Sequence, residues 1–130
     1  MSKPRILVVD DNWPVGKLVG SRLEQTGCFD VRVEHMPSAA PRAATEFLPQ
    51  LFLLDVDMPG QNGLELAAQL CKDPAFARTP VIFLTSLVTA DEAGARELIS
   101  QGRRYVSKSA SVDILRQCIE RALTSVHSGS

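Results

Sequence analysis

The sequence predicts an α/β protein in which a parallel sheet carries helices on both of its faces. Short apolar runs, rich in leucine and β-branched residues, alternate with amphipathic stretches along all 130 residues. Three of these runs are four residues long and lack polar alternation, which is typical of strands buried on both faces. Strict alternation of strand and helix favours a doubly wound parallel sheet.

The expected elements divide the chain into five strand–helix pairs. Apolar runs predict strands over residues 6–9, 31–33, 51–54, 81–84 and 105–106. Apolar residues at helical spacing predict helices over residues 15–23, 39–47, 64–71, 91–101 and 112–123. A chain of this length fits one domain, which we place at residues 1–125. We expect residues 126–130 to be a disordered tail or the remnant of a linker.

Boundary signals support the elements in the first third of the chain. Asn12 is the expected N-cap of the first helix, and Pro14 lies in its first turn, where proline is tolerated. Gly27 ends this helix. Val31 and Val33 alternate with charged residues, which predicts a half-exposed edge strand.

The later elements rest on apolar patterning. The leucine-rich third run gives the strongest strand prediction, and the turn-forming residues 58–63 separate it from the next helix. In the helix expected over residues 91–101, Leu98 and Ile99 should point inward. Gly94 weakens that helix by up to about 1 kcal/mol relative to alanine. The last helix has a well-patterned apolar stripe.

Charge and cysteine content narrow the class of protein. The 14 Lys and Arg and 15 Asp and Glu give a formal net charge of −1, whereas binding to nucleic acid through bulk charge requires the neutralisation of many phosphates. We therefore expect no direct DNA binding by this chain. The three cysteines lie far apart in no ligand pattern, which indicates thiols in a reducing compartment. No segment approaches the roughly 18 apolar residues of a membrane span, so we expect a cytoplasmic protein that does not contact a membrane.

Polar residues follow the expected strands at the points where the strands end. They are Asp10, Asp11, Asp55, Thr85 and Lys108. In an open parallel sheet, ligands bind outside the carboxyl ends of the strands, so these side chains should meet in one crevice. Clustered carboxylates repel one another unless a cation neutralises them. Oxygen ligands without His or Cys favour a hard cation, and Mg²⁺ fits better than a Ca²⁺ cage.

Four motifs in chain order resemble the receiver domain of the response regulators of two-component systems. They are Val8-Val9-Asp10-Asp11, then Leu53-Leu54-Asp55-Val56-Asp57-Met58-Pro59 with Gly63, then Phe83-Leu84-Thr85-Ser86, and Tyr105-Val106-Ser107-Lys108. The resemblance covers residues 4–125. It implies a flavodoxin-like (βα)₅ fold with parallel strand order 2-1-3-4-5.

The resemblance implies a role for each residue of the expected crevice. Asp55 would accept a phosphoryl group from a histidine kinase or a phosphotransfer protein, and Lys108 would contact that group. Asp11 and Asp55 would bind Mg²⁺ directly, together with the backbone carbonyl of Asp57. Asp10 would help to bind the ion through water.

The resemblance also implies a conformational switch. Thr85 would move toward the phosphoryl group on activation, and Tyr105 would follow by changing rotamer. The surface formed by the fourth helix, fifth strand and fifth helix would then signal to a downstream protein. Such a chain would be a signalling module rather than an enzyme, and we expect a monomer or a weak dimer.

Other interpretations stay open. Asp10 and Asp11 could be ordinary helix-capping residues, and Tyr105 could be a half-buried aromatic residue. Trp13 could cap the first helix or overhang the metal site, where it would report on binding. For the whole chain, one alternative is a docking module that is never phosphorylated. A less favoured one is an aspartate-nucleophile phosphatase, suggested by Asp55-Val56-Asp57.

Two features depart from the family pattern. The family usually has proline after the active-site lysine, joined by a cis bond, whereas Ser109 follows Lys108 here. A cis bond before a residue other than proline costs about 2.5–4 kcal/mol, so we predict a trans bond and a loop that holds Lys108 less firmly. The pair Arg103-Arg104, with further arginines, makes the switch surface basic. It is either a solvated face or a docking surface for an acidic partner.

Overall fold

The computed structural model describes residues 3–58, 60–86, 98–100 and 103–128. Its strands are β1 (Arg5–Val9), β2 (Asp30–Glu34), β3 (Leu51–Asp55), β4 (Val81–Thr85), β5 (Leu98–Ser100) and β6 (Arg103–Ser107). Its helices are α1 (Trp13–Gln25), α2 (Ala40–Phe47), α3 (Gly63–Cys71) and α4 (Val112–Ser128), with short 3₁₀ turns at Pro37–Ala39 and Pro74–Phe76.

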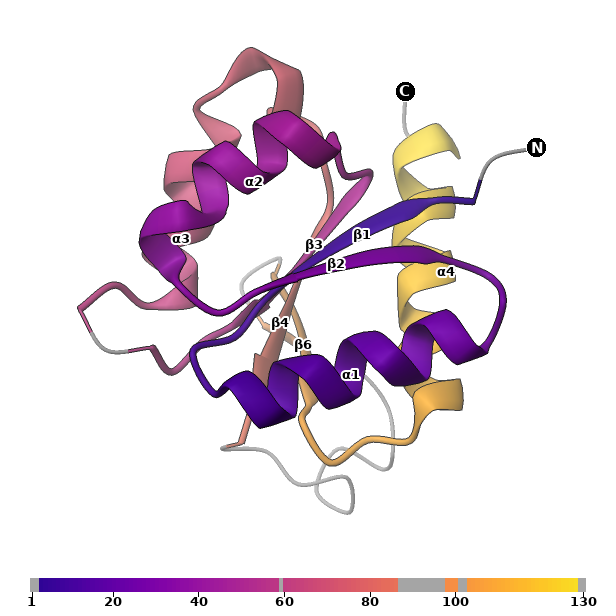
Figure 1. Cartoon of the computed structure of the whole chain (residues 1–130). Coiled ribbons are helices and arrows are strands. Elements are labelled where there is room, and N and C mark those ends of the chain that lie inside the picture. The colour runs from indigo at the N-terminus through magenta and orange to yellow at the C-terminus, as the bar shows by residue number, and fades with distance from the viewer. Residues whose placement is uncertain (1–2, 59, 87–97, 101–102, 129–130) are drawn as a thin grey trace.

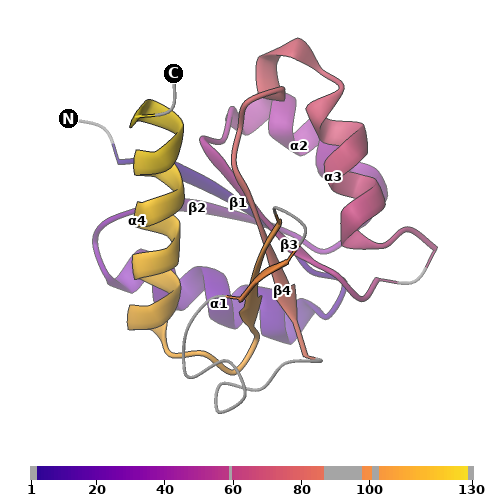
Figure 2. The same ribbon diagram turned by 180° about the vertical axis from the view of Figure 1, so that it is seen from behind.

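The strands form one sheet in the order β2-β1-β3-β4-β6-β5. The first five of these are parallel, and β6 is the fifth strand of the predicted series, so the flavodoxin-like order 2-1-3-4-5 is confirmed. Two layers of helices cover the sheet. The front and back views show α1 and α4 on one face and α2 and α3 on the other (Figures 1 and 2).

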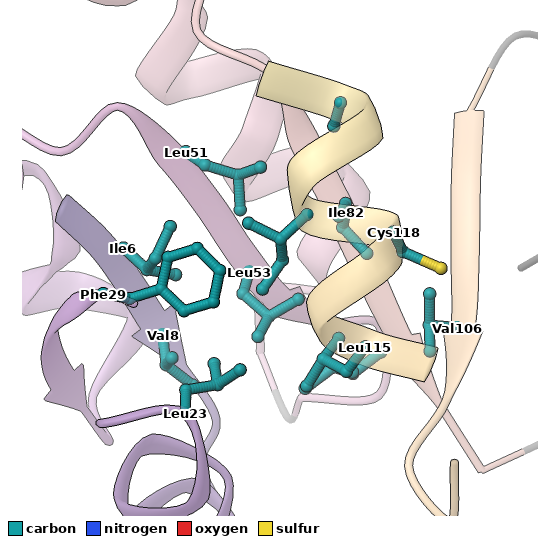
Figure 3. Close-up of a cluster of buried hydrophobic side chains, with 13 residues drawn as sticks. Ile6, Val8, Leu23, Phe29, Leu51, Leu53, Ile82, Val106, Leu115 and Cys118 are labelled. Carbon is teal, nitrogen blue, oxygen red and sulfur yellow. The ribbon is translucent and has the colours of Figure 1, made fainter. Parts of the chain in front are cut away.

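Alternate residues of the central strands supply the two cores. Ile6 and Val8 of β1 point toward α1 and α4, whereas Leu7 and Val9 point toward α2 and α3. Figure 3 shows the first of these cores, where side chains of β1 and β3 meet Leu115 and other residues of α4. Both faces of the central strands are apolar, as their unbroken hydrophobic runs predict.

The first helix and the β2 edge agree with the prediction. The Asn12 side chain accepts a hydrogen bond from the Val15 N–H at 3.3 Å and caps α1. Gly27 adopts a φ of 75° just beyond the helix, a conformation that favours glycine. Strand β2 pairs with β1 and is mostly half-buried, so the predicted edge strand is confirmed.

The predicted helix over residues 91–101 lies largely outside the described residues. For residues 98–100, which the structure describes, the prediction of a helix is wrong. Strand β5 occupies Leu98–Ser100 and runs antiparallel to β6. Ile99, predicted to point inward, is 59% exposed. The pairing of Ser100 with Arg103 leaves two residues between the strands, and the second of these is a glycine. This spacing is a hairpin signal, which competes with the helical pattern.

The C-terminal helix is longer than expected. Helix α4 continues to Ser128, beyond the predicted end at residue 123. The domain boundary at residue 125 stays a prediction. Within the described part of the chain, no helix has both the length and the apolar character to cross a bilayer.

Candidate functional site

The parallel strands bring five polar residues to one edge of the sheet. They are Asp10 and Asp11 after β1, Asp55 at the end of β3, Thr85 at the end of β4, and Lys108 after β6. The strand registers place these ends side by side, because Asp55 pairs with Leu84 and Thr85 pairs with Ser107. This is the edge at which the sequence predicts a crevice.

Three carboxylates gather there. One oxygen from each of Asp10, Asp11 and Asp55 lies within 4.8 Å of the other two. Asp10 and Asp55 are fully buried, whereas Asp11 is exposed. The predicted meeting of these carboxylates is therefore confirmed as geometry.

Backbone N–H groups fix one oxygen of each buried carboxylate. The Asn12 N–H donates to Asp10 Oδ1 at 2.9 Å, and the Asp57 N–H donates to Asp55 Oδ1 at 3.1 Å. Both bonds reach a carboxylate two residues back, which is the usual geometry of an Asx turn. The second oxygen of each carboxylate therefore has a defined direction.

A glycine allows the backbone after β3 to pass close to α3. A Cβ built on Gly63 would overlap the backbone oxygen of Asp55, nearer to it than real Cβ atoms approach such an oxygen. The Gly63 N–H donates to the Val56 carbonyl at 3.1 Å. The capping box formed by Asn62 and Glu65 then starts α3. Gly63 thus sets the position of the loop that carries Asp57.

Lys108 supplies the positive charge of the site. Its Nζ lies 3.0 Å from Asp55 Oδ1 and 3.4 Å from Asp10 Oδ2, and its side chain is 19% exposed. Its backbone N–H donates to the Thr85 carbonyl at 3.0 Å, which continues the β4–β6 ladder by one residue. The lysine is therefore held at both its backbone and its side chain.

Burial and neighbouring charges shift the pKa values of these groups. Burial raises the pKa of Asp55, and Asp10 raises it further, while the hydrogen bond from Lys108 only partly compensates. Burial, followed by hydrogen bonding and repulsion from Asp55, raises the pKa of Asp11. Burial lowers the pKa of Lys108, but attraction to Asp55 and Asp10 outweighs that effect and raises it overall. The site therefore holds more negative charge than its lysine neutralises.

The carboxylate oxygens fit a hard cation. Among the described residues, Asp10 Oδ2 and Asp55 Oδ2 are buried and have no hydrogen-bond partner. Lys108 Nζ comes within ion-pair distance of Asp10 Oδ2, yet that contact does not meet hydrogen-bond geometry. Buried carboxylate oxygens without donors are costly unless a positive charge compensates them. An all-oxygen cluster of this kind suits Mg²⁺.

The residues of the predicted switch lie on strands that lead to the site. Thr85 is buried, with 3% exposure, at the end of β4. Tyr105 of β6 is half-buried, and its ring lies 5.4 Å from that of Phe83. Asp57 is exposed at the site's edge. Their positions agree with the predicted roles, and the roles themselves stay predictions.

Two residues beside the site make contacts that the sequence pattern did not predict. The ring of His35 is the first, and it lies 4.8 Å from the ring of Trp13. This contact arises because the Asp10 N–H donates to the Glu34 carbonyl, which brings the end of β2 beside the start of α1. Ser107 is the second, because its hydroxyl bonds within the turn that carries the site's lysine.

The peptide bond between Lys108 and Ser109 is trans, so that prediction is confirmed.

Arg103 is exposed and Arg104 half-buried on β6, as expected for a basic strand. On α4, Arg116 pairs with Glu120 at 2.7 Å, which partly neutralises this arginine. Arg103 and Arg104 begin β6, whereas Lys108 directly follows its last residue, so the two arginines and the site lie at opposite ends of this strand.

Comparisons with known proteins agree with one another. The sequence model of the response regulator receiver domain matches residues 6–120. The transcriptional regulatory protein YkoG of Bacillus subtilis is 33% identical over 129 residues, covering 95% of this chain and 52% of YkoG. The chemotaxis protein CheY1 of Helicobacter pylori is 27% identical over 124 residues, covering 92% of this chain and 96% of CheY1.

The solved structures that resemble the chain include a response regulator from Desulfuromonas acetoxidans. It aligns with a TM-score of 0.75 and 30% identity over 93% of this chain and 97% of that one. The chain spans about half the length, or less, of the first transcriptional regulators that it matches. It spans nearly all of CheY1.

Proposed function

The chain belongs to the response regulator receiver domain family, and on this premise we propose that Asp55 accepts a phosphoryl group in a Mg²⁺-dependent reaction. The donor is a histidine kinase or a phosphotransfer protein. One observation carries the proposal. Lys108 Nζ lies 3.0 Å from Asp55 Oδ1, inside a cluster of carboxylates with an excess of negative charge.

Asp55 has the properties of a nucleophile in this site. Its Oδ1 is occupied by the Asp57 N–H and by Lys108, whereas its Oδ2 has no hydrogen-bond partner among the described residues. The carboxylate forms a bond to phosphorus, and the bond between phosphorus and the donor nitrogen breaks. Lys108 neutralises charge on a phosphoryl oxygen, and the Thr85 hydroxyl binds another.

The metal site is formed by the same carboxylates. Asp11, Asp55 and the backbone carbonyl of Asp57 would hold Mg²⁺ directly, and Asp10 would contribute through water. When bound, Mg²⁺ supplies the positive charge that lets an anionic phosphoryl group approach a carboxylate cluster. The buried oxygens of Asp10 and Asp55 that lack donors support this assignment.

Phosphorylation acts on the rest of the molecule through Thr85 and Tyr105. Thr85 closes β4 at the site, and the half-buried Tyr105 packs against Phe83 one strand away. A shift of Thr85 toward the phosphoryl group gives the Tyr105 ring room to change rotamer. The altered surface binds a downstream protein, and arginines of β6 favour an acidic partner.

Receiver domains are generally signalling modules without catalytic turnover of their own. We assign the same class to this chain, and we place it in the cytoplasm as a monomer or weak dimer. It has no direct contact with DNA in this assignment. The chain spans 52% and 44% of the lengths of two transcriptional regulators among its relatives.

Phosphorylation by a small donor tests this function. The protein is incubated with Mg²⁺ and acetyl phosphate, and intact-mass spectrometry follows the gain of one phosphoryl group. We expect one group per chain on the wild type, none on Asp55→Asn, and none after chelation of the metal. Equal labelling of the wild type and of Asp55→Asn would contradict the assignment.

Further assays on the same protein separate this function from the phosphatase and docking-module alternatives. Continued release of phosphate from a generic phosphate ester would indicate a phosphatase. A lack of any response to Mg²⁺ or to beryllofluoride would indicate a docking module. The fluorescence of Trp13 should follow both ligands, because this residue is 45% exposed and begins the helix that comes after Asp11.

A further inference from the structure

The turn that carries Lys108 is closed by two serines. The Ser107 hydroxyl oxygen accepts a hydrogen bond from the Ser109 N–H at 3.1 Å. The two serine hydroxyl oxygens lie 2.8 Å apart and share a second hydrogen bond. The Ala110 N–H donates to the Ser107 carbonyl at 3.1 Å, which closes the turn a third time. Lys108 stands between the two serines.

The two serines differ in their surroundings. Ser107 is the last residue of β6 and is 5% exposed, so its hydroxyl is buried at the base of the turn. Ser109 is exposed. Ser107 takes part in both side-chain bonds, whereas the Ser109 side chain takes part in one. Ser107 is therefore the more important of the two.

The turn directly adjoins Lys108, whose backbone and side chain both contact residues of the site. The Lys108 N–H donates to the Thr85 carbonyl at 3.0 Å, and its Nζ reaches Asp55 at 3.0 Å. A lysine side chain has four rotatable bonds, so its ammonium stays on a carboxylate only when its backbone has a fixed direction. The ladder bond fixes that direction on one side of Lys108, and the serine turn fixes it on the other.

We propose that Ser107 and Ser109 are positioning residues that hold Lys108 on Asp55 through a trans turn. Their hydroxyls do the work of the proline that usually follows this lysine in the family. Because serine, unlike proline, keeps its backbone N–H, the Ser109 N–H is available, and in this trans turn the buried hydroxyl two residues back accepts it. The proposal deepens the proposed function and rests on it, since Lys108 matters through phosphoryl transfer.

The rate of phosphorylation tests this role. The variants are Ser107→Ala, Ser109→Ala and the conservative Ser107→Thr, each assayed with acetyl phosphate at saturating Mg²⁺. We expect Ser107→Ala to slow phosphorylation about three- to tenfold, which corresponds to the loss of two neutral hydrogen bonds. Ser109→Ala should slow it about twofold, because one bond is lost. Ser107→Thr keeps the hydroxyl and should restore the rate.

A second pair of variants separates positioning from a general loss of structure. In a Lys108→Met background, Ser107→Ala should have no further effect on the rate, because the group that it positions is gone. The same slowing with and without the lysine would overturn the proposal. So would a wild-type rate in Ser107→Ala.

Amide hydrogen exchange reads the turn without any phosphorylation. We expect Ser107→Ala to accelerate exchange of the Lys108 N–H, while the Arg32 N–H of β2, which faces β1, keeps its wild-type rate. Unchanged exchange at Lys108 would overturn the proposal. If the wild type takes no phosphoryl group and Lys108 exchange still accelerates, the proposed function fails while the serine turn stands.

Discussion

The interior of the sheet and its carboxyl edge follow opposite rules. In the interior, Leu53 and its neighbours are fully buried, and each contacts apolar side chains of a covering helix layer. At the edge, Asp10 and Asp55 are equally buried, yet each keeps an oxygen without a hydrogen-bond partner among the described residues. The interior therefore stabilises the fold, whereas the edge holds unfavourable negative charge that the proposed cation would neutralise. The same strands provide both, because each of the two buried aspartates directly follows an apolar residue of its strand.

The largest effect on stability should come from the interior. Leu53→Ala removes a fully buried side chain from the core between β3 and α4. We expect a loss of about 2–5 kcal/mol in the free energy of unfolding, from lost burial and from the cavity left behind. Urea unfolding measures it, with Leu48→Ala, a side chain 54% exposed, as the control. An equal loss of unfolding free energy in the two variants would show that the buried interior is not the main source of stability.

The next effect comes from the backbone that supports the edge. Gly63→Ala places a methyl group against the Asp55 carbonyl, which cannot move without shifting the loop after β3. We expect a loss of about 1–3 kcal/mol, typical of overpacking. Gly16→Ala is the control, because its added Cβ would meet Asp10 Cβ at 3.2 Å and Val33 Cγ1 at 3.3 Å, contacts that need shifts of only a few tenths of an ångström. A stability loss in Gly16→Ala as large as in Gly63→Ala would argue against a special role for the backbone contact.

A charge removed from the edge should stabilise the protein without metal. Asp10→Asn keeps the oxygen that accepts the Asn12 N–H and removes one buried negative charge. Without Mg²⁺, we expect a gain of about 1–2 kcal/mol in unfolding free energy, the scale of an unsatisfied buried group. The exposed Asp30→Asn should change stability by less than about 0.5 kcal/mol. The Mg²⁺ affinity of Asp10→Asn should fall, and a destabilised variant with wild-type affinity would contradict this account.

The smallest effect is a pH dependence with a defined sign. The folded-state pKa values of Asp11 and Asp55 lie above their ordinary value of 3.8. The folded state therefore binds more protons than the unfolded state just above pH 3.8, and stability without Mg²⁺ should fall as pH rises through that window. The slope cannot exceed about 1.4 kcal/mol per pH unit for each proton released.

Urea unfolding across pH measures this slope. Asp55→Asn removes one of the two titrating groups and should flatten it. Saturating Mg²⁺ should reverse it, because the ion binds the deprotonated carboxylates. A wild-type slope in Asp55→Asn would mean that other groups cause the effect.

The contrast also explains which parts of the structure the sequence predicts. Central strands are set by local apolar runs, and parallel order then brings Asp10, Asp55 and Lys108 to one edge, so their meeting could be predicted. Strand β5 could not, because Leu98 and Ile99 fit a helix stripe and a short strand equally well. Its pairing with β6 decides between them, and that pairing is a non-local contact.

The finer contacts of the site lie beyond sequence patterns for another reason. The pairing of Trp13 with His35 depends on how the end of β2 meets the start of α1. The bonds between Ser107 and Ser109 depend on the dihedral angles of a turn, which serine does not dictate. The sequence showed only that proline is missing after Lys108.

A crystal structure with Mg²⁺ and beryllofluoride tests the central claim most directly. We expect the ion between the carboxylates of Asp11 and Asp55, and beryllofluoride on Asp55 within hydrogen-bond distance of Lys108 Nζ. The bound ion would then neutralise the unfavourable negative charge of the edge carboxylates, a charge that the apolar interior lacks. An ion bound away from Asp11 and Asp55, or Asp55 left unmodified, would contradict the account.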